Sequence, residues 1–285
     1  MKRHLTGFDV ANTVRMAHTQ RRVSFLLVEG ETDLLCLQRF ADRNACDILV
    51  CHGRTNALHA TQLLDEARDA GFVTLVDADF DRLAGIDPPS QNCVLTDFHD
   101  LVVVLFCSPA LERVLAERGS DEKIAAFEAS VGRSVRDALF DYAKPLGYLR
   151  WLNQRAGLNL TFADLDIGRL LNEGTLMLDL PRTVQVLTQR SGCPQHATAI
   201  HEQHAAIAQA GHDSRQVSSG HDVVALLGIG LRSVLGSQRA VDVRGEVLEL
   251  ELRLAFDQGA FESTGVCAGL LEWEGRNPGW RVLAA

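Results

Sequence analysis

Short apolar runs alternate with amphipathic segments along the first 100 residues of the chain. Four of these runs are rich in β-branched and aromatic residues and predict buried strands: 23–28, 47–51, 72–76 and 93–96. The intervening segments predict helices, one capped by Thr32 and another over 56–70 that ends at Gly71. Strands that are buried on both faces and separated by helices are typical of a parallel sheet with right-handed crossovers.

The rest of the chain is rich in Leu, Ala, Arg and Glu, which predicts a mainly helical region. We expect helices at 99–118, 121–140, 196–210, 221–235 and 246–256, a break at 145–147, and shorter helices with loops across 148–190. The predicted fold class is therefore α/β, with a parallel sheet flanked by helices and followed by helical structure. The predicted organisation is a basic N-terminal segment (1–20), an α/β core (21–118) and a helical region packed on that core (119–285).

The composition is that of a folded globular protein, because 46% of the 285 residues are hydrophobic and 23% are charged. The 28 basic and 37 acidic residues leave a net charge of −9, which argues against a non-specific nucleic-acid coat. It does not exclude an enzyme that holds a nucleic acid through a local basic patch and bound cations. Only three basic residues are Lys, and although Arg suits phosphate binding, genomic base bias is the simpler explanation.

The sequence predicts a cytoplasmic protein that does not enter a membrane. It has no apolar run of about 18 residues, and its N-terminal segment lacks the apolar centre of a signal peptide. The seven cysteines are an odd number and form no Cys-x-x-Cys pair. This pattern argues against a zinc ribbon and a disulfide framework, and it fits a reducing compartment.

Two acidic motifs directly follow predicted strands. Glu29-Gly30-Glu31-Thr32-Asp33 follows the first strand, and Asp77-Ala78-Asp79-Phe80-Asp81 follows the third. Because the carboxyl ends of neighbouring parallel strands share one crevice, we expect Glu29 and Asp77 to project into the same site. Asp79 and Asp81 follow Asp77 at a period of two, so an extended segment points them the same way.

Carboxylates gathered in one crevice repel each other, and a divalent cation removes that conflict. Mg²⁺ prefers oxygen ligands and combines one or two carboxylates with substrate phosphate oxygens, an arrangement that suits phosphoryl transfer. Gly30 lets backbone approach a phosphate closely.

Each motif alone has a simpler interpretation. Glu31 and Asp33 can decorate a helix N-terminus, and Asp-x-Asp-x-Asp can form a calcium loop. The calcium loop fails here because Arg82 and Pro88 stand where that loop needs Gly and Glu. The combination of both motifs at the ends of buried strands favours a functional site.

An apolar strand with Glu29-Gly30-x-x-Asp33, followed by an apolar strand with Asp77-x-Asp79-x-Asp81, resembles the TOPRIM domain of topoisomerases, primases and OLD nucleases. The finer similarity is to OLD-like TOPRIM proteins of bacterial anti-phage systems, including the effector subunit of the PARIS system. It runs from residue 20 to about 280. Further similar segments are Leu95–Leu101, Pro145–Arg150, Gly220–Asp222, Leu252–Phe256 and Trp273-Glu274.

The resemblance implies a Mg²⁺- or Mn²⁺-dependent endonuclease that acts on RNA, including transfer RNA, or on DNA, as a toxic effector of phage defence. Glu29 matches the catalytic glutamate, as general base or metal ligand, and Asp77 and Asp79 match the metal-binding aspartates. Asp81 and Asp33 would be supporting ligands. The resemblance also implies an ATPase partner, because the chain has no Gly-Lys-Ser/Thr phosphate loop of its own. A homodimer is a further expectation.

One residue departs from the family pattern. Similar proteins read His-Asp-Leu-Glu where this chain reads His99-Asp100-Leu101-Val102, and valine cannot ligate a metal. Three outcomes follow: Asp100 or Asp97 takes that role, the second metal site is weak, or nuclease activity is lost. The last outcome would leave a TOPRIM-like binding or scaffold protein.

Other candidate residues have weaker patterns. His196, His201 and His204 share a predicted surface helix, and His201-Glu202-Gln203-His204 is one residue short of a zinc-protease motif. His221 and Asp222 follow Ser219, and they either form a capping box or face the carboxylates as a proton donor or phosphate contact. Tyr142 and Tyr148 are the only tyrosines, and a topoisomerase would need a much larger chain around its nucleophile.

A phosphatase of the haloacid-dehalogenase type is the third functional hypothesis. Asp77 would then be the covalent nucleophile and Asp79 the acid. That fold also needs a later lysine, for which only Lys123 and Lys144 are present, and it leaves Glu29-Gly30 unexplained.

Overall fold

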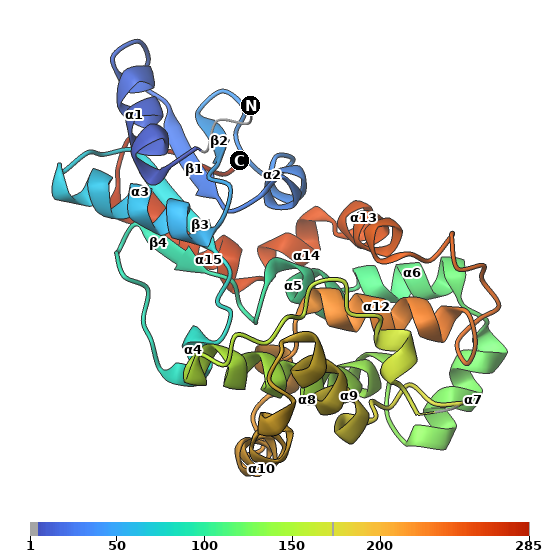
Figure 1. The fold of residues 1–285 in the computed structure, drawn as a ribbon. Coiled ribbons are helices and arrows are strands. Elements are labelled where there is room, and N and C mark those ends of the chain that lie inside the picture. Colours follow the sequence, from blue (N-terminus) through green and yellow to red (C-terminus); the bar gives the residue numbers. More distant parts are fainter. Residues whose placement is uncertain (1–4, 173, 285) are drawn as a thin grey trace. The chain divides into compact units, whose positions relative to one another are not determined.

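The computed structural model describes residues 5–172 and 174–284, and it confirms the α/β class (Figure 1). The chain forms two compact units. The first contains the sheet and comprises Met1–Asp81, Gly85–Leu101 and Asp257–Ala285. The second is helical and comprises Arg82–Ala84 and Val102–Phe256. These units differ from the boundaries predicted at 20 and 118, chiefly because the C-terminal segment belongs to the unit with the sheet.

The sheet has four parallel strands in the order β2-β1-β3-β4, as predicted for strands linked by helical crossovers. The strands are β1 (Ser24–Val28), β2 (Cys46–Val50), β3 (Phe72–Val76) and β4 (Cys93–Leu95). In the register of the two central strands, Val28 lies opposite Leu75. The residues that follow β1 and β3 therefore emerge at the same end of the sheet, next to each other.

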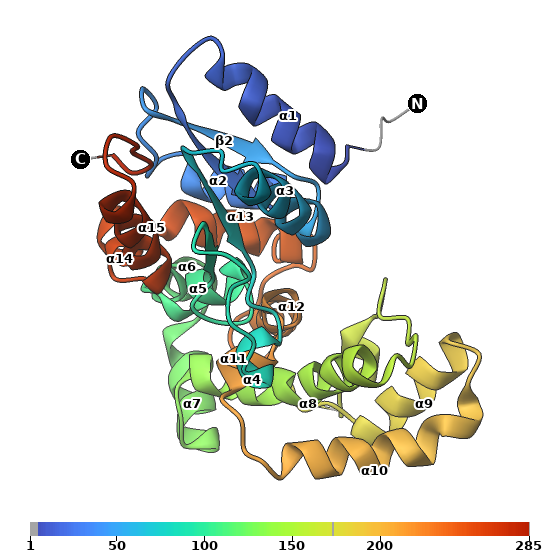
Figure 2. The same cartoon turned by 90° about the vertical axis from the view of Figure 1, so that its left-hand side faces the viewer.

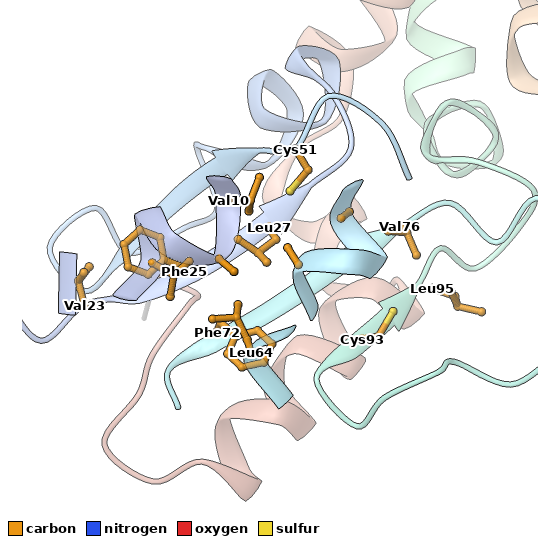
Figure 3. Packing of buried hydrophobic residues seen from close by; sticks show 14 of the residues in the cluster. Val10, Val23, Phe25, Leu27, Cys51, Leu64, Phe72, Val76, Cys93 and Leu95 are labelled. Atoms are coloured by element: carbon orange, nitrogen blue, oxygen red, sulfur yellow. The ribbon is translucent and has the colours of Figure 1, made fainter. Parts of the chain in front are cut away.

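The core of this unit forms because alternate strand residues meet two amphipathic helices. On one face, Phe25, Leu27 and Phe72 pack with apolar residues of α1 (Gly7–His18) and α3 (Arg54–Glu66) (Figure 3). The alternating residues Leu26, Val73 and Leu75 lie outside this cluster and are also almost completely buried. Both faces of β1 and β3 are thus covered, which is why these strands are continuous apolar runs.

The remaining helices of this unit complete its covering. They are α2 (Glu31–Leu37), α14 (Gln258–Glu262) and α15 (Gly265–Arg276). The short helix α4 (Asp81–Ala84) follows β3, and its last three residues belong to the helical unit. The predicted Thr32 cap is wrong, because α2 begins at Glu31 and its N-cap is Gly30, two residues earlier. The helix predicted to end at Gly71 ends at Glu66, and Gly71 instead occupies a turn with φ +78°.

The C-terminal residues are tied to the sheet by hydrogen bonds. The Arg281 N–H donates to Ser24 Oγ (3.0 Å), and the N–H groups of Val282 and Leu283 donate to the Glu274 carboxylate (2.7 and 2.8 Å). Trp273 is fully buried and its indole N–H donates to Asn92 (2.8 Å). These contacts explain why a segment more than 150 residues from the sheet in sequence still belongs to its unit.

The helical unit contains one long helix and several shorter ones (Figure 2). Their bounds are α5 (Leu101–Cys107), α6 (Ala110–Arg118), α7 (Asp121–Val131), α8 (Val135–Ala156), α9 (Leu180–Arg190), α10 (Ala197–Ala208), α11 (Ser214–Val217), α12 (Gly220–Leu231) and α13 (Gly245–Ala255), with 3-10 turns at Ile167–Leu170 and Pro194–His196. The helices predicted over 196–210 and 246–256 are confirmed. In the described part of the chain, no helix is both long and apolar enough to span a membrane.

Three predicted helix boundaries in this unit are wrong. The helix predicted over 99–118 is interrupted before Pro109, and the one over 121–140 ends at Gly132, whose φ is +69°. The break predicted at Pro145 is absent, since α8 continues through it. Proline removes one helical hydrogen bond, and the packing of α8 against α10, α11 and α12 offsets that loss.

Candidate functional site

Glu29 and Asp77 meet at the carboxyl end of the two central strands. A Glu29 carboxylate oxygen accepts a hydrogen bond from the Asp77 backbone N–H at 2.9 Å. The Asp77 carboxylate in turn accepts one from the Leu101 N–H at 3.0 Å. The structure therefore brings together the two residues that sequence analysis placed in one site. We refer to Glu29, Asp33, Asp77, Asp79, Asp81 and Asp100 together as the acidic end of the sheet.

Burial and mutual repulsion perturb the two central carboxyl groups. Burial is the main cause that raises the pKa of Glu29 to about 7, while the Asp77 N–H opposes the shift and Asp79 adds to it. The pKa of Asp77 is raised well above its usual range, again chiefly by burial and then by the charges of Asp100 and Glu29. Both shifts favour the protonated form of these carboxyl groups, compared with exposed carboxylates.

The raised pKa of Glu29 predicts a measurable effect on stability. The folded state binds a proton at Glu29 up to about pH 7, whereas the unfolded chain releases it near pH 4.5, so stability falls as pH rises through this window. Replacing Glu29 by Gln keeps an acceptor for the Asp77 N–H but cannot ionise. We expect its free energy of unfolding to exceed the wild-type value by about 1–3 kcal/mol at pH 8, and by much less at pH 5.

Urea unfolding of both proteins at pH 5, 6, 7 and 8 measures this difference. Glu31→Gln is the matched control, because Glu31 is an exposed acid only two positions away. A constant difference between Glu29→Gln and wild type across the pH range would contradict the prediction.

Asp33 and Gly30 organise the start of α2. The Gly30 N–H donates to the Asp33 carboxylate at 2.8 Å, so Asp33 closes the helix N-terminus as one half of a capping box. The charge of Asp33 also contributes to the raised pKa values of Glu29 and Asp77. A Cβ atom on Gly30 would lie at ordinary contact distances of 3.8 Å from Asp33 and Thr32, so the fold itself does not require glycine here.

Asp79 and Asp81 bind an arginine that sequence analysis did not select. Arg54, the first residue of α3, donates from Nη1 to Asp79 at 2.6 Å and from Nη2 to Asp81. Asp79 itself adopts a left-handed backbone conformation with φ +45°, and its N–H donates to the His99 carbonyl at 2.7 Å. An arginine shortly after the second strand, next to Gly53, was the available sequence signal for Arg54.

Asp97 and Asp100 both follow β4, and both were candidates to replace the acid that is missing at Val102. The structure gives them different contacts. Asp97 accepts hydrogen bonds from the N–H groups of Gly265 and Val266 and thereby caps α15. Asp100 is buried, and its charge raises the pKa of Asp77 more than any other charged group does. Of the two candidates to replace the missing acid at Val102, Asp100 is thus the one that acts on the acidic end.

His221 and Asp222 belong to the helical unit, and the acidic end belongs to the other. Ser219 is the N-cap residue of α12, as predicted, but the capping box is not formed, because the Ser219 side chain makes no cap hydrogen bond. Asp222 is buried and accepts two hydrogen bonds from Arg150, each of 2.8 Å. His221 is exposed and contacts Glu249 at 2.6 Å.

The histidines of α10 do not form a metal site. His204 is 4% exposed, and its Nε2 lies 3.0 Å from the Pro145 carbonyl. Burial lowers the pKa of His204, so this ring is neutral at physiological pH. The surface-helix prediction is confirmed for His201 and wrong for His204, whose ring helps attach α10 to α8.

The acidic end offers two carboxyl groups for a divalent cation. Among the described residues, no three His, Cys, Asp or Glu side chains gather closely enough to hold a metal ion. Glu29 and Asp77 nevertheless fit one, because they are half-buried neighbours linked by a hydrogen bond, and Mg²⁺ needs only one or two carboxylate ligands. Asp79 and Asp81 do not fit a metal as arranged, because each already forms an ion pair with the Arg54 guanidinium.

No protein-family model matches the chain, and no curated protein matches it. The functional proposal therefore rests on the fold and on the geometry of the acidic end.

Proposed function

We propose that this protein is a cytoplasmic, divalent-metal-dependent nuclease of the TOPRIM type that hydrolyses phosphodiester bonds of RNA or DNA. One observation carries the proposal: Glu29 and Asp77 are joined by a hydrogen bond of 2.9 Å at the carboxyl end of adjacent parallel strands. This end of an open parallel sheet is where α/β proteins bind their ligands. Two acidic groups raised in pKa at such a position are candidates for catalysis.

The roles of the residues follow from their environments. Glu29 and Asp77 would hold a Mg²⁺ or Mn²⁺ ion, which when bound polarises a phosphate and stabilises its developing negative charge. In the alternative role of general base, in which Glu29 does not ligate the ion, its pKa of about 7 lies near the operating pH, where a general base works best. Asp100 raises the pKa of Asp77, and Asp33 keeps the Gly30 backbone N–H in place.

The biological setting is part of the same proposal. A nuclease that acts without restraint is toxic to its host, which suits an effector of anti-phage defence. Control by an ATPase partner is proposed because the chain has no phosphate loop of its own.

A catalytically inactive binding or scaffold protein is the second candidate. Two observations favour it: Val102 stands where similar proteins have an acid, and Arg54 forms ion pairs with Asp79 and Asp81. Such a protein has no need to bind a metal at Glu29 and Asp77.

A phosphatase of the haloacid-dehalogenase type is less well supported. Lys123 donates to the Ser233 carbonyl at 3.0 Å and to Ser237 Oγ at 2.9 Å, so it ties α7 to a neighbouring loop. Lys144 lies over the ring of Tyr148. Both later lysines thus have structural contacts of their own within the helical unit.

A cleavage assay tests the proposal. Purified protein is mixed with labelled RNA, single-stranded DNA and duplex DNA in Mg²⁺ or Mn²⁺, and we expect at least one substrate to be cut and EDTA to abolish cutting. A generic phosphomonoester in the same assay detects a phosphatase. The nuclease proposal fails if no nucleic acid is cut even after release from any co-purifying partner, and if Glu29→Ala behaves as wild type in cells.

A further inference from the structure

Arg54 joins two segments of the sheet-containing unit at the acidic end. It begins α3, four residues after the end of β2, and its partners Asp79 and Asp81 follow β3. The Arg54 side chain is 19% exposed and that of Asp81 is 15% exposed, so their ion pair is largely removed from water. Charge pairs in such surroundings are screened much less by salt than surface pairs.

The guanidinium divides the carboxylates into two groups. Each of its terminal nitrogens bonds a different aspartate, so one positive charge bridges Asp79 and Asp81. Glu29 lies outside this bridge, because its carboxylate accepts a hydrogen bond from the Asp77 N–H instead. Asp79 and Asp81 thus each pair with Arg54, whereas among the described residues neither Glu29 nor Asp77 forms an ion pair.

A guanidinium differs from a metal ion in two ways that matter here. It stays protonated at any physiological pH, so it cannot release the aspartates by losing its charge. It also presents planar donors, each of which satisfies one carboxylate oxygen, and leaves no open coordination position for a water or a phosphate. The Arg54 Nε is buried and has no hydrogen-bond partner among the described residues, so the two aspartates are its only strong anchors in that set.

We propose that Arg54 takes the place of a second divalent cation, so that the acidic end binds one metal ion, at Glu29 and Asp77. This inference rests on the proposed metal-dependent function and specifies its metal stoichiometry. Asp79 and Asp81 then become metal ligands only when Arg54 is removed or displaced. The two ion pairs of Arg54 also give a structural reason for a weak second metal site, which is one of the three outcomes that follow from Val102 in the sequence.

Counting bound Mn²⁺ tests this inference without any activity assay. Isothermal titration and the electron paramagnetic resonance signal of free Mn²⁺ are measured for wild type, Arg54→Gln and Arg15→Gln. Arg15 is the matched control, because it forms a comparable pair with Asp69 at 2.7 Å within the same unit. We expect one ion per chain for wild type and Arg15→Gln, and two for Arg54→Gln. Circular dichroism and thermal melting verify that each variant is folded.

Two further variants assign the ions. Adding Asp79→Asn to Arg54→Gln should return the count from two to one, and Glu29→Gln in the wild type should remove the single ion. Arg54→Lys, which keeps the charge, should bind one ion and serves as a second readout if Arg54→Gln does not fold.

The outcomes separate this inference from the proposed function. One ion in both wild type and Arg54→Gln, or two in wild type, overturns the role of Arg54 and leaves a metal site at Glu29 intact. No ion in any variant overturns the metal-dependent function together with the inference. No ion in wild type but one or more in Arg54→Gln shows that Arg54 excludes metal altogether, which overturns the single-ion site.

Discussion

Replacing Glu29 by Gln is expected to reduce metal-dependent cleavage by about 10²- to 10⁴-fold, the usual contribution of a general base. Glutamine can still accept the hydrogen bond from the Asp77 N–H, so the local backbone should be unchanged. It lacks the negative charge that would hold a cation, and it cannot accept a proton from an attacking water. Initial rates on the substrate cut best by the wild type measure the loss.

Two comparisons show whether the loss arises from Glu29 itself. Glu31→Gln removes an exposed carboxylate from the same motif and should retain activity close to that of the wild type. If Glu29 is a general base that does not ligate the metal, the wild-type rate should also rise between pH 6 and pH 8, because Glu29 then becomes ionised around pH 7. Equal rates for Glu29→Gln and Glu31→Gln would contradict a catalytic or metal-binding role for Glu29.

Replacing Asp222 by Ala is expected to lower the free energy of unfolding by about 2–3 kcal/mol, because it removes both hydrogen bonds to a charged guanidinium. The Asp222 side chain is only 5% exposed, whereas that of Arg150 is 28% exposed and can regain some hydration. Because Arg150 is partly exposed, we expect a smaller loss of unfolding free energy than when one partner of a fully buried ion pair is removed. Urea unfolding monitored by circular dichroism measures the change.

The surface pair of Asp166 and Arg169 provides the control for this experiment. Both side chains are more than half exposed, so Asp166→Asn should change stability by less than about 1 kcal/mol. Asp222→Ala should retain nuclease activity at temperatures well below its unfolding midpoint. A variant of unchanged stability that has lost cleavage would instead support the hypothesis that Asp222 is a functional residue.

The strands of the sheet were predictable because each one is encoded by a short, continuous pattern of residues. Runs such as Phe72–Val76 combine high β propensity with burial on both faces, and only a strand between helical layers satisfies both properties. The end of each strand was equally clear, since an acidic residue follows the apolar run at Glu29 and at Asp77. The rule that neighbouring parallel strands end together then placed these two residues in one site.

The helical unit was less predictable because its boundaries depend on packing. Pro145 normally ends a helix, yet α8 continues through it where α10, α11 and α12 pack against this helix. His204 has the spacing of a surface residue but is buried against the Pro145 carbonyl. In both cases contacts with residues remote in sequence outweigh the local preference.

The sequence by itself determined the α/β class, the strands and the proximity of Glu29 and Asp77, because strand periodicity and parallel topology follow from nearby residues. Only the tertiary structure decided how the remaining acids are used. Asp97 caps α15, Asp222 pairs with Arg150, and Asp79 and Asp81 pair with Arg54. A carboxylate has the same local signature whether its partner is a metal ion, a helix end or a guanidinium, and folding alone selects which of these lies within its reach.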